Sequence, residues 1–229
     1  MKLDAVASNY DQAAGYYDKL TGFVFQTLLR KEKKYRRKTV DHLGDITGKR
    51  VLDIGCGTGR NFPYLVPAVG VRGEIVGLDY SQGMLDQARQ LVSHRHWHNV
   101  TLIRGDAAEI ATGNELFDAA ISTWCLGIVH DLDAALNQAI SRVKPGGRIA
   151  IMDFQGAKPE HGPLRWFYPF YSYLLRQAGI DSREDVDDAR LRAKWEQGRK
   201  LLESRLTDIV METYLQGLGF VLAGTVKSG

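Results

Sequence analysis

VLDIGCGTG, residues 51–59, decides the fold of this chain. The first four residues are typical of a buried strand that Asp53 helps to end, and glycine occupies three of the next five positions. Glycine tolerates positive φ and lets a ligand lie against bare backbone. The segment that follows reads as a helix, whose first N–H groups and dipole attract an anionic group. The stretch therefore predicts a strand, a ligand-binding loop and a helix N-terminus.

The loop has two other interpretations. One is a tight turn without a ligand, and the other is a dinucleotide site, whose pattern is G-x-G-x-x-G. Here the third glycine comes one residue early, and Arg60 stands where the last glycine of that pattern belongs. The spacing therefore disfavours a nicotinamide or flavin site.

Short apolar runs alternate with helix-period segments through the middle of the chain. Ser81 precedes an amphipathic helix as its expected N-cap, and a second amphipathic helix is expected after Asp131. Strands that alternate with amphipathic helices imply right-handed βαβ units and a parallel sheet. The expected strands are 50–54, 74–79, 100–105, 117–122 and 147–153.

The chain reads as one domain, 1–229, in four parts. Residues 1–45 form an N-terminal helical cap, and 46–155 form the ligand-binding core. Residues 156–206 are a helical insertion or lid, aromatic at first and then rich in charge. Residues 207–229 contain two strand-like runs joined at a glycine turn, which predicts a closing antiparallel hairpin.

Two further carboxylates follow expected strands. Asp79 ends the second strand about 20 residues past the glycine loop, where a carboxylate accepts hydrogen bonds from ribose hydroxyls. Asp106 follows the third strand, where it can accept from an adenine amine. Each has a structural alternative, as a helix cap or a turn residue. Ser81 is the better cap beside Asp79.

VLDIGCGTG, GLDYS, GDA, FDAAIST and VKPGGR, in this order, resemble the class I S-adenosylmethionine methyltransferases. The resemblance implies an α/β Rossmann-like fold: a mostly parallel seven-stranded sheet with a C-terminal antiparallel hairpin and helices on both faces. It implies S-adenosyl-L-methionine as cofactor and S-adenosyl-L-homocysteine as product, with Asp53 facing the cofactor's ammonium. The cofactor contacts that it implies are Asp53, Gly55, Cys56, Gly57, Gly59, Asp79, Tyr80, Met84, Asp106, Ala107, Thr123 and Trp124.

The N-terminal run NYDQAAGYYDKL resembles the subgroup with the quinone C-methyltransferases and bacterial phosphatidylethanolamine N-methyltransferases. In that subgroup the N-terminal segment folds over the cofactor. The resemblance therefore makes Tyr10 and Tyr17 candidate cofactor contacts, although packing tyrosines are an equal alternative. It does not decide between the two kinds of acceptor.

Methyl transfer from a sulfonium needs alignment and exclusion of water more than a catalytic motif. His130 follows the fourth strand, where acceptors enter this fold, and is the candidate base together with Tyr17. A surface or capping histidine is the alternative for His130. The three histidines of HRHWH, 94–98, have no cysteine or carboxylate beside them, so no metal site is predicted.

Two segments favour an apolar or lipid-like acceptor. FVFQTLLRKEKKYRRK, 23–38, sets apolar residues beside basic ones, as in helices that lie on anionic membranes. RWFYPFYSYLL, 165–175, is aromatic enough to wall an apolar pocket. Core packing is the alternative for both segments, and a dimer contact is a further one for the second.

The remaining alternatives are a soluble acceptor, RNA, and a module that binds the cofactor without catalysis. No D/N-P-P-Y motif follows the fourth strand, which argues against methyltransferases that act on the exocyclic amines of nucleic-acid bases. A net charge of +3 is too weak to indicate nucleic acid. Two cysteines do not make a disulfide framework. The expected location is cytoplasmic, with peripheral attachment to a membrane left open, and the oligomeric state is not indicated.

Overall fold

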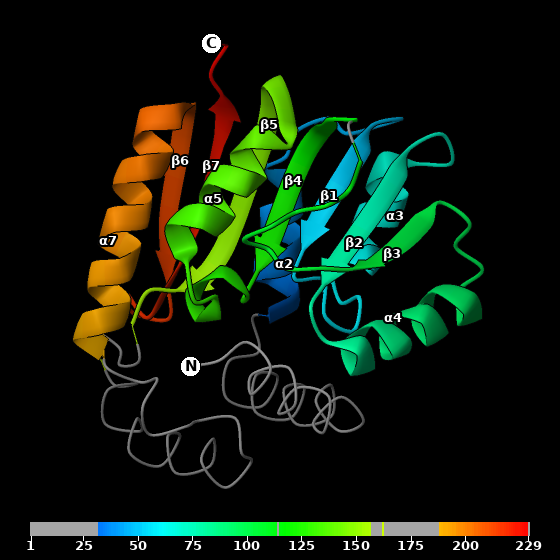
Figure 1. The fold of residues 1–229 in the computed structure, drawn as a ribbon, viewed down its shortest axis with the longest axis horizontal. Coiled ribbons are helices and arrows are strands. Elements are labelled where there is room, and N and C mark those ends of the chain that lie inside the picture. Colours follow the sequence, from blue (N-terminus) through cyan, green and yellow to red (C-terminus); the bar gives the residue numbers. More distant parts are fainter. Residues whose placement is uncertain (1–31, 114, 157–161, 163–187, 229) are drawn as a thin grey trace, which may run out of the picture.

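A computed structural model describes residues 32–113, 115–156, 162 and 188–228 (Figure 1). Within them the chain forms one seven-stranded sheet with helices on both faces. The strands are β1 (Arg50–Ile54), β2 (Glu74–Asp79), β3 (Val100–Arg104), β4 (Phe117–Thr123), β5 (Val143–Phe154), β6 (Leu206–Tyr214) and β7 (Gly219–Val226). The helices are α2 (Glu32–Asp41), α3 (Phe62–Val69), α4 (Gln82–His94), the 3₁₀ turn η1 (Leu126–Ile128), α5 (Leu132–Ser141) and α7 (Asp188–Arg205).

The strand order is β3-β2-β1-β4-β5-β7-β6. Strands β1 to β5 pair in parallel, and β7 inserts antiparallel between β5 and β6. The strand order reverses direction at β1, which has β2 on one side and β4 on the other. Such a reversal opens a crevice at the carboxyl ends of the strands, where ligands bind in open α/β sheets. The predicted fold class, including the antiparallel closing hairpin, is confirmed.

Burial explains why the central strands form. Strands β1, β2 and β4 are almost continuously buried, as expected for parallel strands that are covered on both faces. On one face, α2, α3 and α4 pack around the buried Phe62 and Leu85. On the other face, α5 and α7 cover the sheet, and the ring of Trp195 meets that of Phe220 edge-on at 4.7 Å.

The predicted helix cap at Ser81 is confirmed, and Asp131 caps the helix expected after it. The Ser81 hydroxyl accepts a hydrogen bond from Met84 N at 3.1 Å. The Asp131 carboxylate accepts one from Ala134 N at 2.9 Å. Each satisfies one of the N–H groups that the first turn of a helix leaves unpaired.

The fifth strand begins earlier than predicted. The fifth strand was expected at 147–153, after the Pro-Gly-Gly run at 145–147. Instead α5 ends at Ser141, and β5 already pairs at Val143. The pairing jumps from Phe117–Val143 to Ala119–Arg148, so the Pro-Gly-Gly run is carried as a bulge within the strand.

The described residues cover the four expected parts of the chain unequally. Only 32–45 of the N-terminal cap is described, and it contains α2. The insertion is represented by α7, whereas 165–175 lies outside the described residues. Across the described part of the chain, no helix is both long and apolar enough to span a membrane. The division into four parts stays a prediction.

Phe62 provides a test of the packing beneath the glycine loop, because its side chain has 0% exposure. Phe62→Ala should lower the free energy of unfolding by ~3–5 kcal/mol, through lost transfer energy and a residual cavity. Val71→Ala is the matched control, since Val71 is 98% exposed, and should change it by less than about 0.5 kcal/mol. Urea denaturation followed by circular dichroism measures both. Equal stabilities would contradict the packing described.

Candidate cofactor and acceptor site

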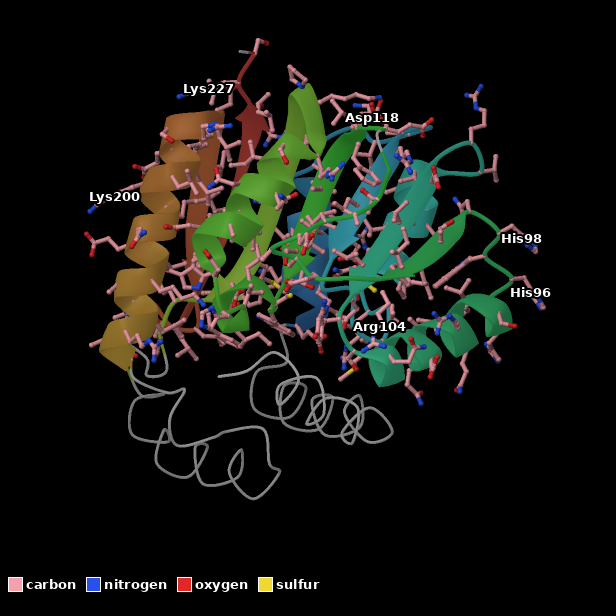
Figure 2. The ribbon with its side chains drawn as sticks, viewed as in Figure 1. His96, His98, Arg104, Asp118, Lys200 and Lys227 are labelled. Atoms are coloured by element: carbon pink, nitrogen blue, oxygen red, sulfur yellow. The ribbon has the colours of Figure 1, made fainter. Side chains whose placement is uncertain are left out.

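A cavity opens at the carboxyl ends of β1, β2 and β4. These strand ends lie along the lower edge of the sheet in Figure 1. In Figure 2, Arg104 lies at this edge, and Asp118 lies at the opposite one. The residues that line the cavity are Arg36, Gly55, Cys56, Gly57, Thr58, Arg60, Leu78, Asp79, Tyr80, Ser81, Met84, Gly105, Asp106, Ala107, Thr123, Trp124, Cys125, Ile128 and Val129.

The glycine loop forms the floor of this cavity. The backbone N–H groups of Gly55 and Cys56 both donate to Leu78 O, at 2.8 and 3.0 Å. Gly55 has φ +67°, and a Cβ there would overlap Cys125 Sγ. Gly57 has φ +55°, and a Cβ there would meet no heavy atom within 4 Å. The loop thus offers bare backbone beside open space, which fits a ligand lying against it.

Gly59 packs against a side chain, whereas the space beside Gly57 is open. It also has positive φ, +84°, but a Cβ there would lie 2.6 Å from the ring of Phe62. Gly59 is not among the residues that line the cavity. Its lack of a side chain lets α3 pack closely on the loop, so its predicted cofactor contact stays a prediction.

Asp79 links the glycine loop to the second strand. Its Oδ2 accepts from Gly57 N at 2.7 Å, and its Oδ1 accepts from Ser81 N at 2.9 Å. The carboxylate is therefore oriented before any ligand arrives, at the position where a ribose hydroxyl pair is expected.

The predicted adenine side lies beside it. Tyr80, Met84, Asp106 and Ala107 line the same cavity. Asp106 Oδ1 accepts from Ala108 N at 2.8 Å, so the carboxylate also holds its own turn. The structure therefore places the predicted ribose and adenine residues together, and their contacts with the cofactor stay predictions.

Asp53 lies behind the cavity rather than on its surface. Its side chain is fully buried, its Oδ1 accepts from Asn61 Nδ2 at 2.9 Å, and its Oδ2 has no hydrogen-bond partner. Burial raises the pKa of this carboxyl group to about 7, although Asn61 and the charge of Arg36 act in the opposite direction. A direct contact between Asp53 and a cofactor ammonium stays a prediction.

Arg36 holds together a buried polar network that the sequence analysis missed. It donates to Asn61 Oδ1 at 2.8 Å and to Thr123 Oγ1 at 2.6 Å. Its Nε donates to Glu32 at 2.8 Å, and the same glutamate pairs with Arg60 at 2.6 Å. The network ties α2 to the glycine loop and to the end of β4. The i, i+4 pair Glu32–Arg36 was its one signal in the sequence.

Trp124 is the rigid wall of the cavity at the end of β4. Its φ is +55°, which is uncommon outside glycine and implies strain held by its surroundings. Its Nε1 donates to Tyr214 Oη at 2.8 Å, and its ring stacks on Phe154 with centroids 5.7 Å apart. The Arg36 guanidinium lies 4.7 Å from the ring centre. Burial keeps the pKa of Tyr214 well above its ordinary value, so its hydroxyl stays protonated.

The candidate catalytic residues are placed only in part. His130 is exposed and does not line the cavity, although its neighbour Val129 does. Tyr10 and Tyr17 lie outside the described residues. The role of these three residues stays a prediction.

None of the histidines of HRHWH lines this cavity. Figure 2 shows His96 and His98 pointing away from the body of the molecule. Within the described ranges, no group of three or more His, Cys, Asp or Glu residues is close enough to hold a metal ion.

The sheet order is that of the class I S-adenosylmethionine-dependent methyltransferase fold, with the cavity at its switch point. The profile of the ubiE/COQ5 methyltransferase family matches residues 1–192. The chain belongs to this family, and it is an enzyme that uses S-adenosylmethionine.

Several known proteins are similar to the chain. Demethylmenaquinone methyltransferase of Renibacterium salmoninarum is 33% identical, over 76% of this chain and 67% of its own. The ubiquinone/menaquinone biosynthesis C-methyltransferase UbiE of Vibrio vulnificus is 31% identical, over 84% and 73%. A SAM-dependent methyltransferase structure from Aquifex aeolicus matches the fold with a TM-score of 0.60, 22% identity, and coverage of 83% and 89%.

The buried carboxyl group of Asp53 makes stability depend on pH. Its pKa is raised from 3.8 to about 7, so between these values the folded state holds a proton that the unfolded chain has released. Stability should therefore fall as pH rises through this window, by at most about 1.4 kcal/mol per pH unit. Asp53→Asn should flatten this slope.

Thermal unfolding of the cofactor-free protein at a series of pH values measures the slope. The interval from pH 6 to 7 is the most informative, because Asp153, with a pKa of about 6, contributes mainly below it. Asp86→Asn, at a 55% exposed side chain on α4, is the control and should keep the wild-type slope. An unchanged slope in Asp53→Asn would refute the assignment.

Asp79→Ala tests the expected ribose contact. The variant should raise the Kd of S-adenosylhomocysteine by ~10- to 100-fold, equivalent to one or two hydrogen bonds to a charged group. Isothermal calorimetry measures the Kd, and circular dichroism checks that the variant is folded, since Asp79 also holds Gly57 N. Asp86→Ala is the control. Wild-type affinity in a folded Asp79→Ala protein would exclude the contact.

Proposed function

We propose that the protein methylates a carbon of an apolar ring acceptor of the quinone type. The observation that carries this proposal is the apolar mouth of the cavity next to the glycine loop, formed by Trp124, Ile128 and Val129. The names of the similar proteins from Renibacterium salmoninarum and Vibrio vulnificus support the acceptor class. A planar apolar acceptor matches walls of this kind.

The chemistry of the mouth supports an uncharged acceptor. Burial keeps the pKa of the Cys56 and Cys125 thiols well above their ordinary value, so both present neutral sulfur to the cavity. Arg36, whose guanidinium lies 4.7 Å from the centre of the Trp124 ring, is engaged by Glu32 and by the polar network. A charged acceptor would find little in this part of the cavity to pair with.

Bound S-adenosylmethionine supplies an electrophilic methyl group on a sulfonium. The enzyme's residues must orient the acceptor carbon in line with that methyl group and exclude water from the contact. As a bond forms to the ring carbon, the ring proton must leave, and His130 or Tyr17 is the proposed group to accept it. Asp79 and the bare backbone of Gly55 and Gly57 would hold the cofactor.

We propose a cytoplasmic enzyme that attaches peripherally to an anionic membrane surface. Helix α2 supports this, because its buried side reaches the cavity through Arg36 whereas Lys33, Lys34 and Arg37 are exposed. Basic residues on the exposed side of this helix would hold the enzyme at a bilayer that contains an apolar acceptor, with about 1 kcal/mol for each basic residue at the surface. Lys38 is less available, because it pairs with Glu212.

A turnover assay against a split panel of acceptors tests the function. The panel contains a demethylated quinol, phosphatidylethanolamine vesicles, small amines, phenols and bulk RNA, each with labelled methyl donor. Product on the quinol alone, located on a ring carbon by mass spectrometry, is the expected result. Asp79→Ala should lose most turnover at subsaturating donor, because it weakens cofactor binding.

Product on the phosphatidylethanolamine amine instead would replace the quinone proposal with a lipid N-methyltransferase. Turnover on RNA that falls steeply with salt would indicate nucleic-acid recognition. If no acceptor in the panel were methylated although the protein still bound S-adenosylhomocysteine, the proposed acceptor class would be contradicted.

A further inference from the structure

The turn at residues 125–129 forms the lip of the cavity. It follows Trp124 and contains η1, and its Ile128 side chain lines the cavity while remaining 51% exposed. An exposed aliphatic side chain at a cavity mouth is in the position to touch an apolar acceptor as it enters. What holds this lip in place is therefore of functional interest.

Two ionisable side chains, from two different elements, form hydrogen bonds with the backbone of the lip. Asp153, at the end of β5, accepts from Gly127 N at 2.9 Å through Oδ2 and from Phe154 N at 2.7 Å through Oδ1. Lys194, on α7, donates through Nζ to Gly127 O at 2.9 Å and also to Val129 O. The donor and the acceptor of one residue, Gly127, are thus both bonded to charged groups.

The fit around Gly127 is tight. A Cβ there would lie 2.9 Å from Asp153 Oδ1 and 3.3 Å from Trp195 Nε1. Asp153 is only 4% exposed, and burial raises the pKa of its carboxyl group and lowers that of the Lys194 ammonium. Burial of both groups is unfavourable unless they are well paired. The hydrogen bonds to the lip give both groups polar partners at these positions.

We propose that Lys194, acting with Asp153, is a positioning residue that holds the lip so that Ile128 makes the apolar contact selecting the acceptor. The inference rests on the proposed function for the identity of the acceptor. It concerns a part of the site that is separate from the cofactor half, because Asp153 and Lys194 do not line the cavity.

The hydrogen bonds from Asp153 and Lys194 to the lip together form a clamp. Lys194→Met tests the clamp, since methionine retains an unbranched side chain but has no hydrogen-bond donor. We expect kcat/KM for the demethylated quinol to fall ~10- to 100-fold, as for the loss of charge-assisted hydrogen bonds. The Kd of S-adenosylhomocysteine should stay within about twofold of the wild-type value, because the glycine loop is untouched. Lys194→Arg, which retains donors and charge, should recover part of the loss.

Lys200→Met is the matched control. It makes the same substitution on the same helix, at a side chain that is 72% exposed and labelled in Figure 2. It should leave both constants unchanged. If Lys194→Met matched this control, or if it weakened cofactor binding as much as it reduced acceptor turnover, the clamp would have no positioning role.

Hydrogen exchange tests the clamp without any acceptor. The amides of Gly127, Ile128 and Val129 should exchange faster in Lys194→Met than in wild type, whereas Lys200→Met should match wild type. Unchanged exchange at the lip would overturn the proposal. If wild-type protein methylates no quinol, the proposed function fails, and the exchange result still decides whether the clamp exists.

Ile128→Ala provides a second variant in case Lys194→Met does not fold. It should lower the preference for an acceptor with an apolar tail over the same ring without one. Val71→Ala, which removes an exposed aliphatic side chain away from the lip, should keep the wild-type preference. Equal preference in all three proteins would remove the role assigned to Ile128.

Discussion

The hydrogen bonds from Gly55 N and Cys56 N to Leu78 O are the constraint on which the cofactor half of the site depends. They join the loop after β1 to the end of β2, so the glycine backbone faces the cavity. Asp79, one residue past Leu78, then reaches Gly57 N and completes the loop. The close approach requires glycine at 55, because a Cβ there would overlap Cys125 after β4. Three strand ends therefore meet around one bare stretch of backbone.

Buried charge connects this loop to the N-terminal helix. Arg36 bonds Asn61 and Thr123, while Asn61 also bonds the fully buried Asp53. Burial favours the protonated form of the Asp53 carboxyl group. Its Oδ2 atom has no hydrogen-bond partner, so the network compensates only in part for the cost of burying this group. Arg36 also packs against Trp124, so the helix braces both the cofactor loop and the acceptor wall.

The sequence predicted the cofactor half well, because local signals specify it. The bounds of β1 and β2, the cap Ser81, and the cavity positions of Asp79 and Asp106 all follow from short motifs. The bulge in β5 was missed, since Pro-Gly-Gly reads locally as a turn although the strand pairs on both sides of it. The Arg36 network was missed because its partners lie 25 and 87 residues away, and the helix pattern indicated only a basic side.

The acceptor half is built from long-range contacts, which is why its residues carry no motif. Trp124 is oriented by Tyr214 of β6, 90 residues later, and the lip after it is bonded by Asp153 of β5 and Lys194 of α7. Strand β5 pairs directly with β4, whereas β6 is separated from it by β5 and β7, so these contacts join elements across half of the sheet. One part of the chain can thus keep a cofactor motif while distant, unrelated positions reshape the acceptor wall. This separation gives a physical reason why cofactor use is readable from the sequence of such an enzyme and acceptor identity is not.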